Sequence, residues 1–253
     1  MYKTLTSDDW LKVLQLGADE VPRALILHGE WFSTSYFEDV EALCGESRAV
    51  ALPTLRIARV RGRMLGFGAC YGSPQAATIL HPLAVLGTET VVQTGWYGAL
   101  QPGMQLGDLL VGDWAFRADG TSDWYLPKGE AADATPGLSE ALLQAAAARG
   151  ITCHRGPIFS TSGIFAETVE LIEEWRQSGY AGVDMEAAAT FAVAKHFGMR
   201  RAAILQLSDN LVESHHLFQR TPDDRAMGAR RRRELLDIAI EVALDEVDPV
   251  SAC

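Results

Sequence analysis

The sequence places two carboxylates on either side of a methionine, where a short apolar run meets an Ala-rich segment. They are Asp184 and Glu186, and Met185 lies between them. In an extended backbone the two carboxylates share one face and Met185 takes the other. A carboxylate can accept both hydroxyl protons of a vicinal diol, and a thioether can pack on the carbon face of a sugar. The segment is a candidate sugar site, although acidic residues also favour a helix N-terminus, which is the simpler explanation.

A second pair of polar side chains follows the apolar run 201–207, which reads as a buried strand. Ser208 and Asp209 come directly after it, so Asp209 is expected just beyond the end of that strand. Open α/β sheets place their ligands at this edge. A Ser/Asp turn or a helix cap explains the pair equally well. Asp209 is therefore a candidate site residue, and both explanations stay open.

These candidates need a scaffold, and the sequence alternates short β-rich runs with helical patterns. The apolar runs predict strands at 24–27, 55–60, 64–69, 90–93, 106–111, 156–160 and 201–207, with 55–60 and 64–69 forming a hairpin. Helical spacing and glycine stops predict helices at 73–86, 138–148, 165–177, 185–197 and 235–244. The stretch 117–136 is expected to be a surface loop or a hairpin tip. The alternation predicts an α/β fold with a central mixed sheet, in a single domain over residues 1–253.

The composition excludes several classes of protein. The chain has 253 residues, of which 33 are acidic and 22 basic, a net charge of −11, and 48% hydrophobic residues, which excludes a disordered chain. The acidic balance argues against a nucleic-acid partner, because phosphate contacts need clustered Lys and Arg. The run Arg230–Arg233 is expected to be the solvated start of the last helix. No apolar run approaches the roughly 18 residues of a membrane span, so we expect no membrane partner.

Cysteine and histidine usage predicts neither a disulfide framework nor a metal site. The first ten residues lack the basic and apolar regions of a signal peptide. His215 and His216 are adjacent but have no cysteine cluster near them in sequence. We therefore expect a reduced, cytoplasmic location and no metal. The scattered cysteines are Cys44, Cys70, Cys153 and Cys253.

Taken together, the two chemical segments resemble a known family. The stretch 182–210, GVDMEAAATFAVAKHFGMRRAAILQLSDN, is similar to the signature region of the nucleoside phosphorylase-I family, which includes hexameric purine nucleoside phosphorylases, uridine phosphorylases and nucleosidases. That family shows V-E-M-E-A-A, an Ala-rich helix, a strand and then S-D. A second landmark is 93–100, QTGWYGAL, which resembles the family's strand that ends in a Gly-rich loop. The resemblance extends over 24–243 and implies a partly barrel-like sheet flanked by helices.

The resemblance implies roles for the candidate residues. Glu186 would hold the ribose 2′- and 3′-hydroxyls, with Met185 against the sugar and Asp184 where the family usually has Glu. Asp209 would be the general acid that protonates a purine at N7, which makes the base a better leaving group. Pyrimidines have no N7, so this aspartate favours purines. On the base side, the resemblance implies Ser208 and Phe165; Phe165 is equally well explained as the first apolar position of a helix.

The phosphate site of the family is where this sequence departs from it. Phosphorolytic members bind phosphate with three arginines; the matching positions here are Ser33, shortly after Gly29, then Ala51 and Gln93. In the loop that follows, Thr94-Gly95-Trp96, Trp96 replaces a phosphate-binding Ser or Thr. Neutral side chains do not replace an arginine fork. We therefore favour water over phosphate as the nucleophile, unless one of five nearby arginines takes over. They are Arg48, Arg56, Arg59, Arg61 and Arg63.

The resemblance thus implies an enzyme that cleaves the N-glycosidic bond of a nucleoside. It implies no metal and no organic cofactor.

The predicted reaction is the cleavage of a purine nucleoside, with water favoured as the nucleophile. A phosphorylase with an altered phosphate site and a non-catalytic nucleoside-binding protein on the same fold are the alternatives. The implied partners are a small-molecule nucleoside, phosphate in the phosphorolytic case, and further copies of the chain in a dimer or hexamer. His28, His81 and Arg225 are further polar candidates that the sequence does not place.

Overall fold

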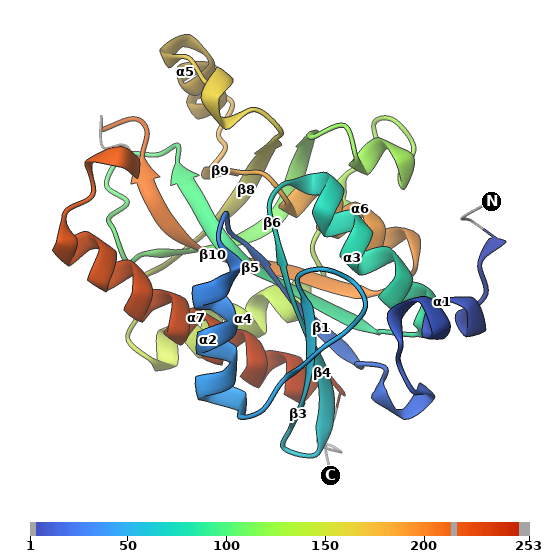
Figure 1. Cartoon of the computed structure of the whole chain (residues 1–253). Helices are drawn as coiled ribbons and strands as arrows, with labels where there is room; N and C mark the ends of the chain where they lie inside the picture. Colours follow the sequence, from blue (N-terminus) through green and yellow to red (C-terminus); the bar gives the residue numbers. More distant parts are fainter. Residues whose placement is uncertain (1–3, 214–216, 248–253) are drawn as a thin grey trace.

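A ten-stranded mixed sheet forms the centre of the computed structural model, which describes residues 4–213 and 217–247 (Figure 1). Its strands are β1 (Ala24–Gly29), β2 (Arg48–Ala49), β3 (Leu55–Val60), β4 (Arg63–Cys70), β5 (Thr90–Ala99), β6 (Leu109–Ala118), β7 (Ala132–Asp133), β8 (Cys153–Thr161), β9 (Gly182–Asp184) and β10 (Arg200–Asn210). The order is β10-β6-β8-β9-β5-β1-β4-β3-β2, with β7 on β6. Strand β10 also pairs with β5, so five of these strands close into a barrel and the rest extend from it.

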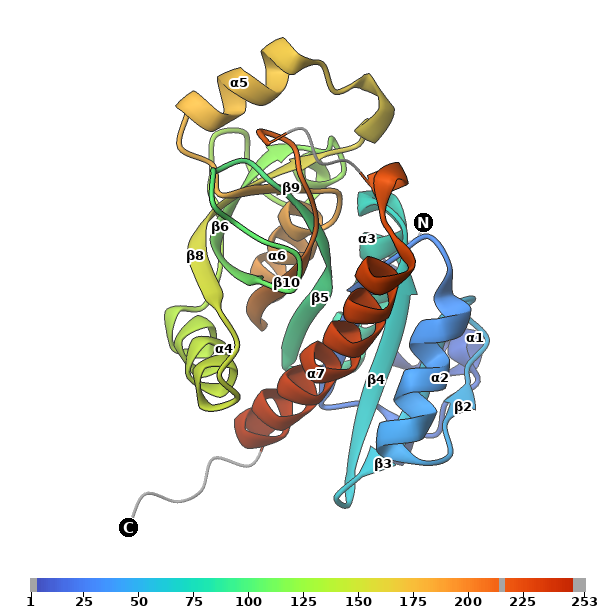
Figure 2. The same cartoon turned by 90° about the vertical axis from the view of Figure 1, so that its left-hand side faces the viewer.

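Helices cover the sheet on two sides. They are α1 (Ser7–Leu14), α2 (Ser33–Cys44), α3 (Ser73–Leu86), α4 (Pro136–Ala148), α5 (Val169–Gln177), α6 (Ala187–His196) and α7 (Pro222–Val247). Helices α2, α4 and α7 share one apolar cluster with the strands, and α1, α3 and α6 contribute to another. Figure 2 shows the long α7 running along one side of the molecule, while α5 stands apart at one end. The predicted α/β fold with a mixed, partly barrel-like sheet is confirmed.

The chain alternates between strands and helices because its apolar residues alternate between short continuous runs and helical spacing. All six residues of β1 are buried, since this strand has neighbours on both edges and layers on both faces. In α7 the buried positions Leu235, Ile238, Ala239 and Val242 follow the spacing of one helical face. Strand β1 pairs in parallel with β4 and β5, and β5 pairs in parallel with β10. The carboxyl ends of these four strands therefore lie at one edge of the sheet. That edge is where the candidate residues gather.

Several predicted elements differ from the structure. The predicted helix at 165–177 is split into a 3₁₀ turn, η4 (Ile164–Ala166), and α5, because Thr168 is extended and caps α5 through Leu171 N, 3.3 Å away. The stretch 93–100 was expected to be a strand that ends in a Gly-rich loop, but β5 continues through both glycines to Ala99. The sequence analysis missed α1, α2 and the short strands β2, β7 and β9.

The run Arg230–Arg233 was expected to be the solvated start of the last helix, and this is wrong. It lies inside α7, which begins at Pro222. Arg232 is buried and pairs through Nε with Asp39 Oδ2 on α2, 2.7 Å away. The run therefore includes a buried contact between two helices, because a four-residue run covers every side of a helix.

Candidate active site

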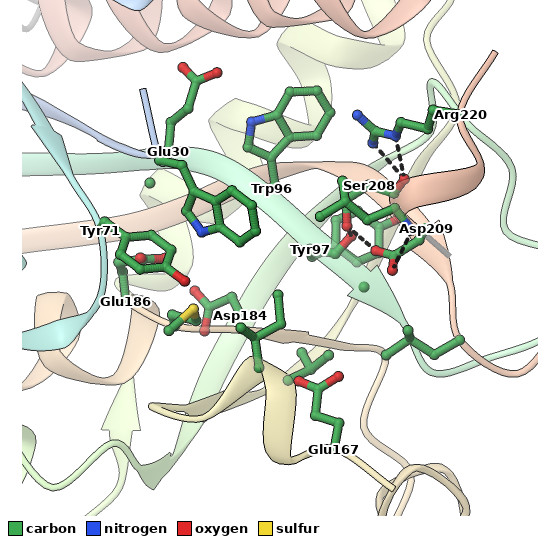
Figure 3. A pocket seen from close by; sticks show the side chains of 18 of the residues that line it. Glu30, Tyr71, Trp96, Tyr97, Glu167, Asp184, Glu186, Ser208, Asp209 and Arg220 are labelled. Atoms are coloured by element: carbon green, nitrogen blue, oxygen red, sulfur yellow. Dashed lines mark hydrogen bonds between the residues drawn. The ribbon is translucent and has the colours of Figure 1, made fainter. Parts of the chain in front are cut away.

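A pocket opens where the carboxyl ends of β1, β5 and β10 meet the turn between β9 and α6 (Figure 3). It brings together residues that are far apart in the sequence, as the topology of an α/β sheet predicts for a ligand site. Seven residues singled out from the sequence line it: Gly29, Trp96, Asp184, Met185, Glu186, Ser208 and Asp209.

Asp184 is a buried carboxylate that is held on several sides. It accepts hydrogen bonds from Ser160 Oγ (2.5 Å), Gln93 Nε2 (3.1 Å) and Ala187 N (2.8 Å). Burial raises its pKa, and these hydrogen bonds oppose that rise. Gln93 does not line the pocket, and its side-chain amide holds the Asp184 carboxylate by a hydrogen bond.

Glu186 is buried next to Asp184, at the start of α6. Its Oε1 accepts a hydrogen bond from Gly72 N at 2.6 Å. Its Oε2 lies against Gly29: a Cβ atom on Gly29 would be only 2.7 Å from it, so no larger residue fits there without a shift. Burial raises the pKa of Glu186, and the neighbouring charge of Asp184 raises it further.

Asp209 and Ser208 share a short contact on the opposite wall. The Ser208 hydroxyl donates to Tyr97 O at 2.9 Å and also contacts Asp209 Oδ1. Asp209 Oδ2 accepts from Leu217 N at 3.3 Å. These contacts fix the carboxyl group of Asp209 at the wall of the pocket.

Among the described residues that line the pocket, Arg220 is the only lysine or arginine. Its Nε donates to Ser208 O at 2.9 Å, and its guanidinium lies 4.6 Å from the centre of the Trp96 ring. Burial lowers its pKa. The stacking on Trp96 and the bond to a main-chain carbonyl hold this arginine against the wall of the pocket.

Glu167 lies across the pocket from Trp96 and Glu30 (Figure 3). It comes from the loop between η4 and α5. Burial, together with the charge of Asp209, raises its pKa to about 7. A carboxyl group in this position changes its charge near neutral pH.

Some predicted residues lie outside the lining. Phe165 is 75% exposed and packs beside Trp31 and Phe218, with ring centres 6.0 and 6.4 Å apart, whereas its neighbour Ile164 lines the pocket. Ser33 is the first residue of α2, and Ala51 is exposed. Neither lines the pocket.

The loop residues predicted near the nucleophile are mostly buried in β5. Thr94 is buried and its Oγ1 lies 2.9 Å from His28 Nδ1. Gly95 pairs with Gly29 across the two strands. Trp96 alone of these three lines the pocket.

The arginines of 48–63 do not line the pocket in the part of the chain that the structure describes. Arg48 pairs with Glu20, and Arg56 with Glu41. His81 lies 3.1 Å from the Tyr125 hydroxyl, and Arg225 donates to Arg220 O. None of these side chains brings a positive charge to the lining.

The sequence analysis assigned no site role to twelve of the described pocket residues, most of which come from loops and 3₁₀ turns. No periodic pattern marks them; the position of Glu30 directly after Gly29 was the nearest signal. They are Glu30, Trp31, Phe32, Tyr71, Tyr97, Gly98, Ile164, Glu167, Val183, Leu211, Leu217 and Arg220. Tyr97 is almost fully buried in β5 and also lines the pocket.

Among residues 4–213 and 217–247, no group of three or more His, Cys, Asp or Glu side chains is arranged to hold a metal ion. His215 and His216 lie outside the described residues. Within the same residues, no helix has the length and hydropathy to span a membrane.

The sequence is similar to that of enzymes acting on nucleosides. A model of the phosphorylase superfamily matches residues 45–241. The chain is 31% identical over 176 residues to a guanosine phosphorylase of Halorubrum lacusprofundi, covering 70% of this chain and 72% of that protein. It is 26% identical over 222 residues to a purine nucleoside phosphorylase DeoD-type 2 of Vibrio cholerae, covering 87% of this chain and 90% of that protein.

The fold is shared with solved structures. A uridine phosphorylase from Vibrio fischeri, complexed with 6-hydroxy-1-naphthoic acid, superposes with a TM-score of 0.78 at 23% identity, covering 91% of this chain and 94% of that chain. A purine nucleoside phosphorylase from Toxoplasma gondii, in complex with immucillin-H, superposes with a TM-score of 0.76 at 20% identity, covering 90% and 93%.

Proposed function

Since this chain belongs to the phosphorylase superfamily, we propose that it cleaves the N-glycosidic bond of a purine nucleoside, with Asp209 as general acid and water as nucleophile. Its relatives are nucleoside phosphorylases, which supports glycosidic-bond cleavage. The observation that carries the proposal is the placement of Glu186 and Asp209 on opposite walls of one pocket. A nucleoside bound between them would have its sugar at one carboxylate and its base at the other.

The proposed roles follow from the chemistry of each wall. Glu186 Oε2 accepts the ribose hydroxyl protons, and Met185 packs on the sugar. Asp209 gives its proton to N7 while the bond between C1′ and N9 breaks, so the electron pair of that bond stays with a neutral purine. Protonation of a leaving group by a placed acid typically supplies about 10²–10⁴-fold in rate.

Water is favoured as the nucleophile because the pocket is acidic where phosphate would need positive charge. The lining holds Glu30, Asp184 and Glu186 on this side, against Arg220, whose guanidinium is engaged with Ser208 and Trp96. Removing the hydration of a phosphate dianion without a charged partner is strongly unfavourable. An arginine from a neighbouring subunit of a homo-oligomer would reverse this balance.

Trp96 also occupies space in the part of the pocket where phosphate would have to bind. A Cβ atom on Gly228 of α7 would lie 3.0 Å from Trp96 Cη2, so the ring packs directly on the helix backbone. The indole therefore fills space between β5 and α7, next to the backbone where phosphate would bind in related enzymes. Phosphorolysis remains the second candidate because the relatives are named phosphorylases.

Glu167 gives the proposal a preferred base. It lies across the pocket from Trp96 and Glu30, and the charge of Asp209 acts on it. A 6-oxopurine presents N–H donors at N1 and, in guanine, at the 2-amino group, which a carboxylate can accept together. Adenine has an acceptor at N1, which a carboxylate repels. We therefore propose guanosine and inosine as better substrates than adenosine, in keeping with the guanosine phosphorylase relative.

Replacing Glu167 by glutamine is expected to lower kcat/KM for guanosine by about 10- to 100-fold, the range of one or two charge-assisted hydrogen bonds. The loss for adenosine should be smaller. Because the pKa of Glu167 is about 7, KM for guanosine should fall as the pH rises from 6 to 8 and the carboxylate forms. This dependence should be absent in the variant. The exposed Glu174→Gln on α5 is the matched control, and equal losses on both nucleosides would contradict the role.

The experiment that tests the activity is a substrate screen. Purified protein is incubated with guanosine, inosine, adenosine and uridine, with and without phosphate, and the free base is measured by chromatography. We expect free guanine and hypoxanthine. Binding of these nucleosides in a thermal-shift assay without release of any base would favour the non-catalytic binding protein.

A further inference from the structure

Two buried carboxylates line the pocket without a cation of the described chain to balance them. Asp184 is 4% exposed and Glu186 is 6% exposed, and both belong to the lining. Neither forms an ion pair with a lysine, arginine or histidine among residues 4–213 and 217–247, and the groups that donate hydrogen bonds to them there are all neutral. These donors are Ser160 Oγ, Gln93 Nε2, Ala187 N and Gly72 N.

The positive charge of the described lining lies on the other wall of the pocket. The Nε of Arg220 donates to Ser208 O at 2.9 Å, and its guanidinium stacks 4.6 Å from the centre of the Trp96 ring. Figure 3 shows Arg220 beside Ser208 and Asp209, on the side away from Glu186. A cation that pairs with the acidic wall inside this pocket would therefore have to come with the ligand.

The two carboxylates differ in what they can still bind. The three hydrogen bonds that Asp184 accepts fix both of its oxygens. Glu186 accepts one side-chain hydrogen bond among the described residues, from Gly72 N to Oε1 at 2.6 Å. Its Oε2 lies against Gly29, another residue of the lining. This oxygen, on a side chain that is more than nine-tenths buried, is open to a donor on a ligand.

An ammonium group satisfies this wall better than a hydroxyl does. Burial raises the pKa of both carboxyl groups, and the charge of Asp184 raises the pKa of Glu186 further. Buried carboxylates without a countercharge are costly in their ionised form, whereas a cation in contact stabilises that form. A hydroxyl offers one neutral donor. An ammonium offers three N–H donors and a positive charge, which makes charge-assisted hydrogen bonds.

The reaction decides which carbon of the sugar can carry this group. Positive charge develops at C1′ as the N-glycosidic bond breaks. An ammonium on C2′, the next carbon, would oppose that charge, while one on C3′ lies further away. In the proposed binding mode Glu186 accepts the protons of both hydroxyls, so a 3′-amine would meet the same carboxylate oxygen.

We propose that the pocket prefers purine nucleosides with an amine in place of the 3′-hydroxyl, which rests on the proposed cleavage of purine nucleosides. The 3′-ammonium donates to Glu186 Oε2, and the charge of Asp184 attracts it at longer range. The amine itself does not react. Water adds at C1′ and loses a proton to solvent. The electron pair of the bond between C1′ and N9 goes to the base, which takes the proton of Asp209. The products are 3-amino-3-deoxyribose and the purine.

The test compares 3′-amino-3′-deoxyguanosine with guanosine and 3′-deoxyguanosine, at a pH at which the amine is protonated. We expect kcat/KM for the 3′-amino nucleoside to exceed that for guanosine by about 10-fold, the difference between a charge-assisted and a neutral hydrogen bond. The 3′-deoxy nucleoside should be the poorest of the three. The isomer 2′-amino-2′-deoxyguanosine should show a lower kcat than the 3′-amino nucleoside. Equal kcat/KM for the 3′-amino nucleoside and guanosine would overturn the inference.

The variant Glu186→Gln assigns the preference to this carboxylate. Its amide should keep the bond from Gly72 N through the oxygen and turn its N–H groups towards the ammonium. The ratio of kcat/KM for the 3′-amino nucleoside to that for guanosine should therefore fall to about one or below. Glu174→Gln, an exposed substitution on α5, is the matched control and should keep the ratio of the unchanged protein. A ratio that Glu186→Gln leaves unchanged would contradict the assignment.

The comparison of nucleosides on the unchanged protein keeps the test decisive if Glu186→Gln does not fold. Cleavage of guanosine without any preference for the 3′-amine would overturn this inference and leave the proposed function standing. Stronger stabilisation by 3′-amino-3′-deoxyguanosine than by guanosine in a thermal-shift assay, with no base released from either, would support the amine site and overturn the proposed cleavage.

Discussion

Replacing Asp209 by asparagine is expected to lower kcat on natural purine nucleosides by at least about 100-fold. The amide of asparagine cannot transfer a proton to N7, so the base must leave as an anion. Its hydrogen-bonding position is otherwise kept, because the amide can still contact Ser208 and accept from Leu217 N. KM should therefore change much less than kcat.

The control for this prediction is a ribonucleoside with an activated leaving group, which needs no protonation and should lose far less activity. Asp223→Asn, an exposed substitution at the start of α7, is the matched variant. If kcat on guanosine or inosine were unchanged in Asp209→Asn, Asp209 would be only a structural residue at the end of β10.

The second large effect concerns the sugar. Glu186→Gln is expected to lower kcat/KM for ribonucleosides by about 10- to 100-fold and to affect 2′-deoxynucleosides less. Gly72 N donates to Oε1, so the amide oxygen of glutamine should take that position. The amide nitrogen would then face the diol, and it cannot accept a hydroxyl proton.

The measurement is kcat/KM for guanosine and 2′-deoxyguanosine in both proteins. A larger loss on the ribonucleoside supports a contact with the 2′-hydroxyl. Equal losses on the two sugars would indicate that Glu186 acts only through the start of α6 and its contact with Gly29.

The sequence predicted the parts of the fold whose patterns are local. The hairpin of β3 and β4 and the bounds of α3 follow from apolar runs and glycine stops, and both are confirmed. Short strands such as β9 carry no periodic signal, because three residues cannot show one. Their pairing is decided by neighbours that are distant in the sequence.

The distinction between local patterns and contacts of distant segments also applies to the site. Asp184 and Asp209, at the ends of β9 and β10, and Glu186, at the start of α6, were found because they lie within one continuous segment that carries the family resemblance. Glu167 and Arg220 come from loops, and only the closed barrel brings them to the pocket. Phe165 was predicted as a base-side residue from the family resemblance, whereas in the structure its neighbour Ile164, in the 3₁₀ turn η4, lines the pocket.

The identity of the sugar product in the presence of saturating phosphate tests the central claim most directly. Guanosine is cleaved with phosphate varied from none to tens of millimolar, and the sugar is identified by chromatography or NMR. The acidic lining and the packed Trp96 predict free ribose and a rate that barely responds to phosphate. Ribose 1-phosphate as the main product, formed at a rate that rises with phosphate, would contradict this account and identify the protein as a phosphorylase.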